Sequence, residues 1–332
     1  PLIFVMPHQY LVSLPTFLPP ADLKIIDESC WQIFVKKSKL ALADLQKIKK
    51  GAPTQVQSVL ERIAASLGAG TPLLKALRDA GLKTTTDFEA VSSWLEREIK
   101  ALTEKLTESS APDFQKLGPW LASHHLVSQL SSEIQHPRSI SHSISFPDCE
   151  SPNTKHQIGI YSLHSTQRNV PVILLDASAD PEINSRIWSP IREYSVSADR
   201  NAAIYQVRGK AFSRQSILGK NAYGRPMNPE SAEDLRQQIL KFITSRLENH
   251  SKILVVAQKR VTKELTGALQ PEIETGRILM GHFSALRGLN SFEDCDAAVI
   301  IGREQPSRGG VEAYARAFYW NDPQPLILGQ GT

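Results

Sequence analysis

An Asp-Glu pair, Asp27-Glu28, directly follows an apolar run that ends in Ile25 and Ile26. The run is typical of a buried strand, and in open α/β sheets ligands bind beyond the carboxyl ends of the strands. An aspartate there can hold Mg²⁺ bound to nucleotide phosphates, and the following glutamate can orient an attacking water. The alternative is an ordinary surface Asp-Glu pair after a strand, and the pair alone does not separate the two.

Three later segments carry polar residues or a glycine turn beside apolar runs. Residues 172–175 lead into Asp176 and Ser178, and residues 252–258 contain a second apolar run. In residues 278–302 an apolar run leads to Arg287-Gly288-Leu289-Asn290, and another apolar run follows. Together with residues 2–11 and 24–31, these segments resemble, in the same order, motifs II to V of superfamily 2 DNA helicases.

The resemblance implies two RecA-like lobes, both incomplete in this chain, with ATP and Mg²⁺ bound between them. Asp27 would hold the Mg²⁺, and Glu28 would polarise the hydrolytic water. No Gly-x-x-x-x-Gly-Lys-Ser/Thr loop occurs in the sequence, and neither does the family's arginine-finger segment. We therefore expect an interior segment of a longer motor, which by itself hydrolyses ATP negligibly, because an arginine finger alone contributes on the order of 10³ to 10⁵ in rate.

The remaining motif residues are implied to couple the nucleotide to the DNA. Asp176 and Ser178 would transmit the nucleotide state, while Arg287, Gly288 and Asn290 would lie at the interface of the lobes. The sequence departs from the family pattern at two of these positions, because Ser178 stands where Thr is usual and Asn290 where Asp is common. A strand-to-loop turn is the ordinary alternative for the Arg-Gly step.

Basic and aromatic residues alternate in residues 192–225. Cations for phosphates and aromatic faces for bases are how proteins grip single strands, so Arg208, Lys210 and Arg214 are predicted nucleic-acid contacts. A solvated strand face with core aromatics is the competing interpretation.

Six of the nine histidines lie between His124 and His164, with Cys149 among them. Imidazole and thiolate suit zinc, but the spacings do not match those of short-paired structural sites. A polar, His-rich loop is the favoured interpretation.

Hydrophobic periodicity indicates which elements position these residues. Residues 2–6, 158–162, 170–175, 202–207, 253–257, 278–280 and 297–301 are predicted strands, arranged in parallel sheets that helices cover on both faces. Residues 38–135 have the helical period, and Thr86 with Glu89 predicts a capping box at the start of the longest helix. The lysines at 36, 37, 39, 47, 49 and 50 are expected on a wet helix face.

The predicted fold is thus α/β, with an all-helical insertion in the first lobe. Residues 1–35 and 157–190 would form the latter part of lobe 1, and residues 36–156 the helical insertion with a His/Ser-rich loop. Residues 195–332 would form lobe 2, incomplete at its C-terminus.

Composition excludes several classes and leaves function open. The 332 residues are 41% hydrophobic and 22% charged with a net charge of +4, which excludes disordered and collagen-like chains and permits a nucleic-acid partner. No apolar run reaches the roughly 18 residues of a membrane helix. Three widely spaced cysteines favour the cytoplasm.

Three functions follow from these observations. The leading one is part of an ATP-dependent DNA helicase or translocase, whose helical insertion acts as a wedge or as an arm for proteins of replication, repair or a mobile element. The second is a complete, helicase-derived DNA-binding or scaffolding module without ATPase activity. The third is a nucleotide-independent α/β protein.

Overall fold

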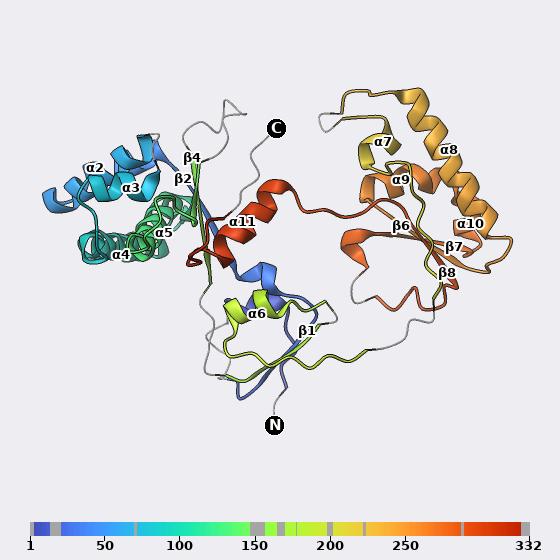
Figure 1. Cartoon of the computed structure of the whole chain (residues 1–332), viewed down its shortest axis with the longest axis horizontal. Helices are drawn as coiled ribbons and strands as arrows, with labels where there is room; N and C mark the ends of the chain where they lie inside the picture. The colour runs from blue at the N-terminus through green and yellow to red at the C-terminus, as the bar shows by residue number, and fades with distance from the viewer. Residues whose placement is uncertain are drawn as a thin grey trace. The chain divides into compact units, whose positions relative to one another are not determined.

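The computed structural model describes residues 3–13, 21–69, 72–146, 157–164, 170–176, 178–197, 202–221, 224–286 and 289–326. The chain divides into two compact units (Figure 1). Unit 1 comprises Pro1–Val196 and Ser307–Thr332, and unit 2 comprises Ser197–Pro306. Each combines helices with strands, and both contain parallel strand pairs, as expected for an α/β fold.

A parallel strand pair carries the Asp-Glu motif in unit 1. Strand β1 (Lys24–Asp27) pairs with β5 (Val172–Leu175), so that Ile26 lies opposite Leu174. One face packs on the apolar side chains of Cys30, Phe34 and Ile187. The other face differs from the expectation of a sheet covered on both sides, because no described helix packs there and Ile25, Ile173 and Leu175 remain exposed.

A second sheet of unit 1 is antiparallel, which corrects the expectation of parallel sheets throughout. In the described residues its strand order is β2 (Val35–Ala41), β4 (Gln157–Leu163), β3 (Ile144–Ser145). Strand β2 contains Lys36, Lys37 and Lys39, so these three lysines lie on a strand and not on a helix face, and the insertion is not all-helical. The reason is nonlocal: β2 pairs with β4, whose partner residues lie about 120 positions later in the chain.

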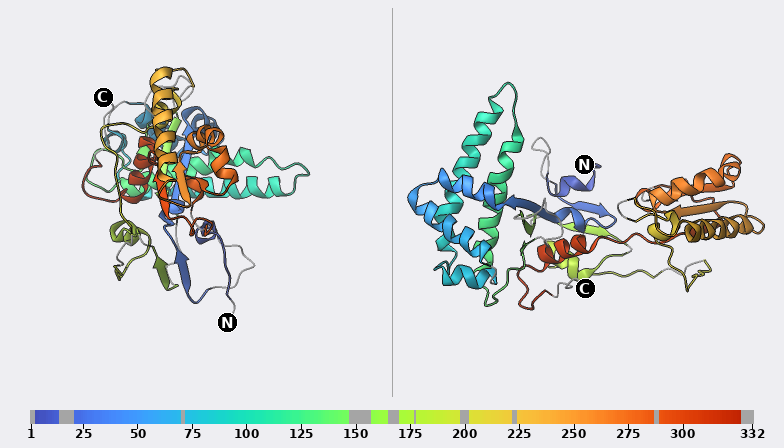
Figure 2. Two further views of the ribbon diagram at one scale, coloured as in Figure 1. Left: turned by 90° about the vertical axis from the view of Figure 1, so that its right-hand side faces the viewer. Right: turned by 90° about the horizontal axis from the view of Figure 1, so that it is seen from above.

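The predicted helices of residues 38–135 are confirmed as a packed block. Apolar side chains at helical spacing form one continuous core together with Leu40, Ile158 and Ile160 of the sheet. The two longest helices of this block run side by side (Figure 2), with the Trp94 and Trp120 ring centroids 5.6 Å apart. The helices are α1 (Leu42–Lys50), α2 (Thr54–Gly68), α3 (Leu73–Asp79), α4 (Thr86–Thr107), a 3-10 turn η3 (Phe114–Leu117) and α5 (Gly118–Glu133).

The predicted capping box at the start of α4 is wrong. Thr85 is the N-cap residue, and its side chain makes no capping bond. Instead, Asp87 Oδ2 accepts the backbone N–H groups of Lys83 and Thr84, each at 2.8 Å. A carboxylate in the first turn accepts hydrogen bonds from backbone N–H groups that would otherwise lack a partner. Its negative charge also interacts favourably with the positive end of the helix dipole.

The C-terminal part of the chain returns to unit 1, whereas residues 195–332 were expected to form one lobe. Helix α11 (Arg308–Phe318) packs on β2 and β4, on the face opposite α5. Ala313 and Ala317 are buried against Tyr161, and Phe318 joins the core around Ile26. The small alanine side chains let the helix approach the sheet closely. The apolar surface buried by this contact holds the helix in unit 1.

A buried carboxylate holds the loop that follows α5. Glu133 is fully buried, and its Oε1 accepts from Arg138 Nη2 at 2.8 Å and from the backbone N–H groups of His142 (2.9 Å) and Ser143 (3.0 Å). Its Oε2 accepts from Ser141 Oγ. Such a charge is tolerated inside a protein only because it is paired and fully hydrogen-bonded.

Arg316 of α11 connects to the same loop. Its Nη1 donates to the carbonyl oxygens of His142 and Ile144, both at 3.0 Å, and Arg138 Nη1 donates to the carbonyl of Asp322 at 3.1 Å. Arg186 of α6 (Pro181–Ile187) also forms an ion pair with Asp322 at 3.0 Å. The segment after residue 306 is therefore fastened at several points to unit 1.

The predicted strand over residues 2–6 is wrong for the part that is described. Residues 3–6 have no regular structure, and Ile3 and Val5 are 87% and 95% exposed. They precede two short 3-10 segments, η1 (His8–Leu11) and η2 (Trp31–Phe34). An apolar run forms a strand only where another strand offers its backbone groups, and none of the described strands pairs here.

Unit 2 contains a parallel sheet with strand order β7, β6, β8 in the described residues. The strands are β6 (Ile253–Ala257), β7 (Ile278–His282) and β8 (Ala297–Ile300), as predicted to within two residues, and a 3-10 turn η4 (Phe283–Ala285) follows β7. Helices α7 (Arg214–Leu218), α8 (Pro229–Arg246), α9 (Lys259–Ala268) and α10 (Gln270–Glu274) supply the rest of its core.

The predicted strand over residues 202–207 is wrong. These residues have no regular structure, and Ile204 and Tyr205 are 73% and 90% exposed. As at residues 3–6, an apolar alternation lacks a strand to pair with. Across the described residues, no helix is both long and apolar enough to cross a membrane.

Candidate functional site

The predicted acidic residues of unit 1 emerge at one edge of the β1–β5 pair. Asp27 is the last residue of β1 and lies opposite Leu175, the last residue of β5, after which Asp176 follows. Because the strands are parallel and in register, both carboxylates leave the sheet at its carboxyl end. The pairing brings together two motifs that are about 150 residues apart in the sequence.

The backbone at Asp27 and Glu28 is tightly constrained. His8 Nε2 lies 2.7 Å from the carbonyl oxygen of Asp27, so the ring donates a hydrogen bond to it. The N–H of Glu28 donates to the carbonyl of Leu175 at 2.8 Å, and Glu28 has a φ of +65°. A non-glycine residue in this left-handed region costs roughly 1 kcal/mol or more, and such strain clusters at functional sites. The side chain of Asp27 is exposed and that of Glu28 half-buried.

Asp176 and Ser178 form a local turn. Asp176 Oδ1 accepts from the backbone N–H of Ser178 at 2.8 Å and from its Oγ at 2.9 Å. Burial, and after it the charge of Asp176, raises the pKa of the Cys30 thiol to about 11. Cys30 is therefore a protonated thiol at neutral pH and is not a nucleophile.

The chain offers no ready-made metal cage in the part that is described. No group of three or more His, Cys, Asp or Glu side chains there could hold a metal ion. Of the His/Cys set considered for zinc, Cys149 and His156 lie outside the described residues. Mg²⁺ that arrives with a nucleotide needs only one or two carboxylates besides phosphates and water, so the exposed Asp27 fits that mode of binding.

The predicted residues of unit 2 are only partly described. Asn290 is exposed, and its carbonyl accepts from the N–H of Glu293 at 3.3 Å. Arg287 and Gly288 lie outside the described residues.

The predicted nucleic-acid contacts lie in an exposed segment of unit 2. Lys210 Nζ donates to Gln238 Oε1 at 2.7 Å, and Arg214 is the first residue of α7. Neither they nor Arg208 form an ion pair with a described residue. Residues 200–229 contain six Lys or Arg and no Asp or Glu. Unit 2 contains 16 basic and 12 acidic residues against 22 of each in unit 1, so it carries the whole net charge of +4.

A buried histidine was not predicted as a polar centre. His125 of α5 contacts both β2 and β4. Its Nδ1 lies 2.9 Å from Ser38 Oγ of β2, and its Nε2 lies 2.7 Å from Ser162 Oγ of β4. Burial, and after it the charge of Lys36, lowers the pKa of His125 to about 3. A ring with that pKa is a poor general base for a serine. The arrangement therefore joins α5 to the sheet and is not a catalytic pair.

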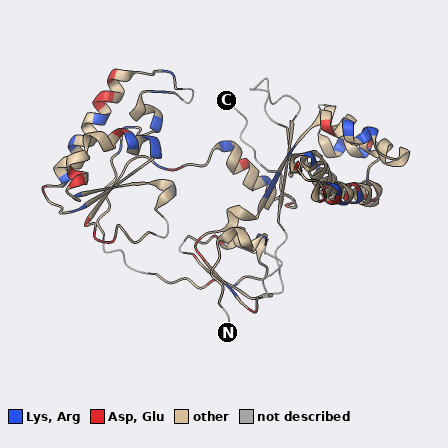
Figure 3. Ribbon diagram, turned by 180° about the vertical axis from the view of Figure 1, so that it is seen from behind, with Lys and Arg blue, Asp and Glu red and all other residues tan. Residues whose placement is uncertain are grey.

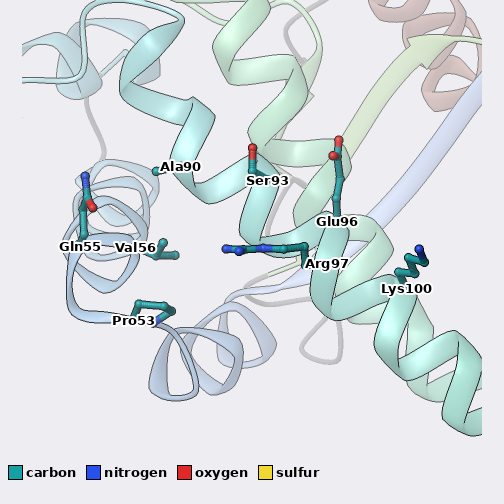
Figure 4. A pocket seen from close by; sticks show the side chains of 8 residues that line it. All are labelled: Pro53, Gln55, Val56, Ala90, Ser93, Glu96, Arg97 and Lys100. Carbon is teal, nitrogen blue, oxygen red and sulfur yellow. The ribbon is translucent and has the colours of Figure 1, made fainter.

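A shallow groove of about 630 Å³ lies on the helical block between α2 and α4 (Figure 4). The Arg97 side chain points across it toward Val56, and Glu96 at its rim also contacts His124 Nε2 at 3.1 Å. None of the predicted site residues lines it.

Comparison of the chain with protein-family models, with curated proteins and with solved structures found no match. The observations that bear on function are therefore the acidic edge of unit 1 and the cationic segment of unit 2.

Proposed function

We propose that the chain is an interior segment of an ATP-dependent DNA helicase or translocase with RecA-like lobes, acting in the cytoplasm. The parallel pairing of β1 with β5 carries the proposal, because it brings Asp27 and Asp176 to one carboxyl-terminal sheet edge. Asp27 and Asp176 are about 150 residues apart in the sequence, so no short-range interaction accounts for their being neighbours. The parallel pairing of β6 with β7 in unit 2 is a second support, because these strands lie in the segments that resemble motifs IV and V.

The roles follow from the chemistry of each side chain. Asp27 would hold Mg²⁺ together with the nucleotide phosphates, and Glu28 would accept a proton from the attacking water. Asp176 and Ser178 would sense the nucleotide across the same edge. Arg287, Gly288 and Asn290 would sense the nucleotide and the strand, as the resemblance implies.

The nucleic acid would bind unit 2 through its cationic segment. Arg208, Lys210 and Arg214 lie within 30 residues that lack acidic side chains, and none is neutralised by a described carboxylate. The exposed aromatic ring of Tyr205 lies in the same segment and can stack on a base.

The second candidate is a helicase-derived DNA-binding or scaffolding module without ATPase activity. The lack of a phosphate-binding loop in the sequence favours it, because Asp27 and Glu28 alone do not bind nucleotide phosphates.

DNA-stimulated ATP hydrolysis separates the two candidates. It is measured for the 332-residue chain and for the protein extended by the coding sequence that flanks it on both sides. The chain alone should be inactive and the extended protein active, and Glu28→Gln in the extended protein should reduce the rate by on the order of 10²-fold or more. Asp22→Asn, which changes an exposed carboxylate before β1, should leave the rate unchanged.

Three results would contradict the proposal. Full activity of Glu28→Gln would remove the catalytic role of that residue. Activity of the chain alone would show that it is not an interior segment. An extended protein that binds DNA but never hydrolyses ATP would establish the second candidate.

A further inference from the structure

Strand β2 presents three lysines along a sheet edge of unit 1. Lys36, Lys37 and Lys39 are exposed, and none forms an ion pair with a described residue. β2 pairs with β4 on one side only, so its other side has no strand partner in the part of the chain that is described. Figure 3, which colours lysine and arginine blue, shows a blue stretch along this strand.

The pleat of β2 separates the lysines onto two faces. Ser38 and Leu40 face α5, because Ser38 contacts His125 and Leu40 joins the helical core. Lys37 and Lys39 therefore lie on the other face, on which α11 also packs, and both stay exposed, about 7 Å apart along the strand. Lys37 Nζ is 5.6 Å from the ring centroid of Tyr161, which supports its side chain.

This spacing matches an extended polyanion. Successive phosphates of a stretched nucleic-acid strand repeat at a similar interval, so Lys37 and Lys39 can each meet one of two successive phosphates without bending either backbone. The unpaired side of an edge strand also presents backbone N–H groups, which are common donors to phosphate oxygens.

The charge around β2 is strongly asymmetric. Residues 29–60 contain six lysines and a single acidic residue, Asp44, although unit 1 as a whole has equal numbers of basic and acidic residues. Asp44 pairs with Lys47, and Lys49 pairs with Glu61, so the β2 lysines are not the ones that are neutralised.

Edge lysines can also serve only to prevent association with another strand. That role requires a charge of either sign at the edge. Nucleic-acid binding requires a positive charge, so reversal of the charge separates the two roles.

We propose that the β2 edge, formed by Lys36, Lys37 and Lys39, is a second contact site for the phosphodiester backbone of single-stranded nucleic acid. The proposal rests on the proposed function of nucleic-acid binding by unit 2. It adds a site in unit 1 that the helicase motifs do not contain.

The test measures binding of a fluorescent oligo-dT strand by the whole chain over a range of salt concentrations. The triple variant Lys36→Glu, Lys37→Glu, Lys39→Glu should weaken binding at least tenfold. It should also reduce the slope of log affinity against log salt by about 0.7 per lysine, or about 2 in all. The matched control is Lys75→Glu, Lys83→Glu, Lys105→Glu, which makes the same charge change at exposed lysines of unit 1 and should alter binding less than threefold.

A third variant distinguishes failure of the inference from failure of the proposed function. Arg208→Glu, Lys210→Glu, Arg214→Glu should weaken binding through unit 2. If it does so and the β2 variant does not, the β2 site is wrong and the proposed function stands. If the wild-type chain does not bind the strand, both are wrong. Equal weakening by the β2 variant and its control would show that the effect comes from net charge alone, and it would overturn the assignment of a binding site to β2.

Two further measurements close the remaining alternatives. Tryptophan fluorescence during urea unfolding should show that the β2 variant is folded, since all five tryptophans lie in unit 1. Polyglutamate should displace the strand far less well than unlabelled oligo-dT. Equal displacement would show that the edge takes an acidic polypeptide and overturn the assignment to nucleic acid.

Discussion

His125 shows how one buried side chain can connect two elements without taking part in chemistry. The neutral ring has one donor and one acceptor nitrogen, and these meet the hydroxyls of Ser38 and Ser162. The ring is 2% exposed, so protonation would place a charge where water cannot reach it. The same burial that makes it a poor base makes it a determinant of acid stability.

Replacement of His125 by leucine should flatten the pH dependence of unit 1 stability. In the unfolded chain the histidine titrates near its ordinary pKa of about 6.5, whereas its pKa in the folded protein is about 3. Below about pH 6.5 only the unfolded chain takes up the proton at His125, so this residue alone lowers the free energy of unfolding by about 1.4 kcal/mol per pH unit down to about pH 3.

The measurement is urea unfolding followed by tryptophan fluorescence at pH 7 and pH 4.5. His125→Leu should be less stable at pH 7 by about 1 to 3 kcal/mol, because two serine hydroxyls lose their partner, yet lose less stability on acidification. His124→Leu, at the more exposed neighbouring position, is the matched control for loss of an imidazole from α5. An equal pH slope in His125→Leu would show that His125 is not the group responsible.

At the level of elements, helix α11 stabilises the antiparallel sheet of unit 1 by covering part of one face. β2 and β4 have α5 on one face and α11 on the other, so a helix packs on each face of the pair, although the three lysines of β2 stay exposed. β1 and β5 have one covered face in the described residues and remain exposed on the other. The apolar runs of β1, β4 and β5 were predicted as strands, whereas β2 was expected to be helical. The helices that cover these strands come from distant parts of the chain.

A carboxylate on the buried face of α11 should detach the helix. Ala317 is fully buried against β4, so Ala317→Glu places a charge among Tyr161 and Leu163 and should cost several kcal/mol. Val311→Glu, on the exposed side of the same helix, is the control and should change stability by less than about 0.5 kcal/mol. Limited proteolysis around residues 307–320 reports the detachment, and equal protection of both variants would argue against the packing described.

At the level of the whole molecule, unit 2 is an insertion between two parts of unit 1. The segment after residue 306 contributes Arg316 to the loop held by Glu133 and Phe318 to the core that supports β1. Unit 2 has its own core and carries the net positive charge. The acidic edge and the cationic segment thus belong to separate folding units, and unit 1 depends on a segment encoded after unit 2.

Truncation after Pro306 should unfold unit 1 and leave unit 2 folded. Loss of Phe318 alone is comparable to a large core deletion of about 3 to 5 kcal/mol, and the hydrogen bonds of Arg316 are lost with it. Near-UV circular dichroism should lose the tryptophan signal, while hydrogen exchange of β6 should stay protected. Truncation after Leu326 should be close to wild type, and retention of the tryptophan signal by the shorter truncation would contradict this division.

Local patterns determined the elements whose signals are contained within a few residues. The helical period placed α4 and α8, and short apolar runs bounded by polar residues placed β1, β5, β6 and β7. The position of Asp27 at a strand end is also a local feature, because the apolar run that precedes it is enough to predict it. That Asp27 and Asp176 meet at one sheet edge follows from the pairing of β1 with β5, because no local pattern specifies which strands pair.

Tertiary structure alone decided the features that depend on a distant partner. Lys36, Lys37 and Lys39 precede a helix and have no strand signal of their own, but β4 offers them a backbone to pair with. Residues 202–207 have a strand pattern without a described partner, and they stay exposed and without regular structure. The sequence by itself therefore determined where chemistry-bearing residues sit on their elements. Pairing and burial, which satisfy backbone hydrogen bonds and remove apolar surface from water, decided which of those elements meet.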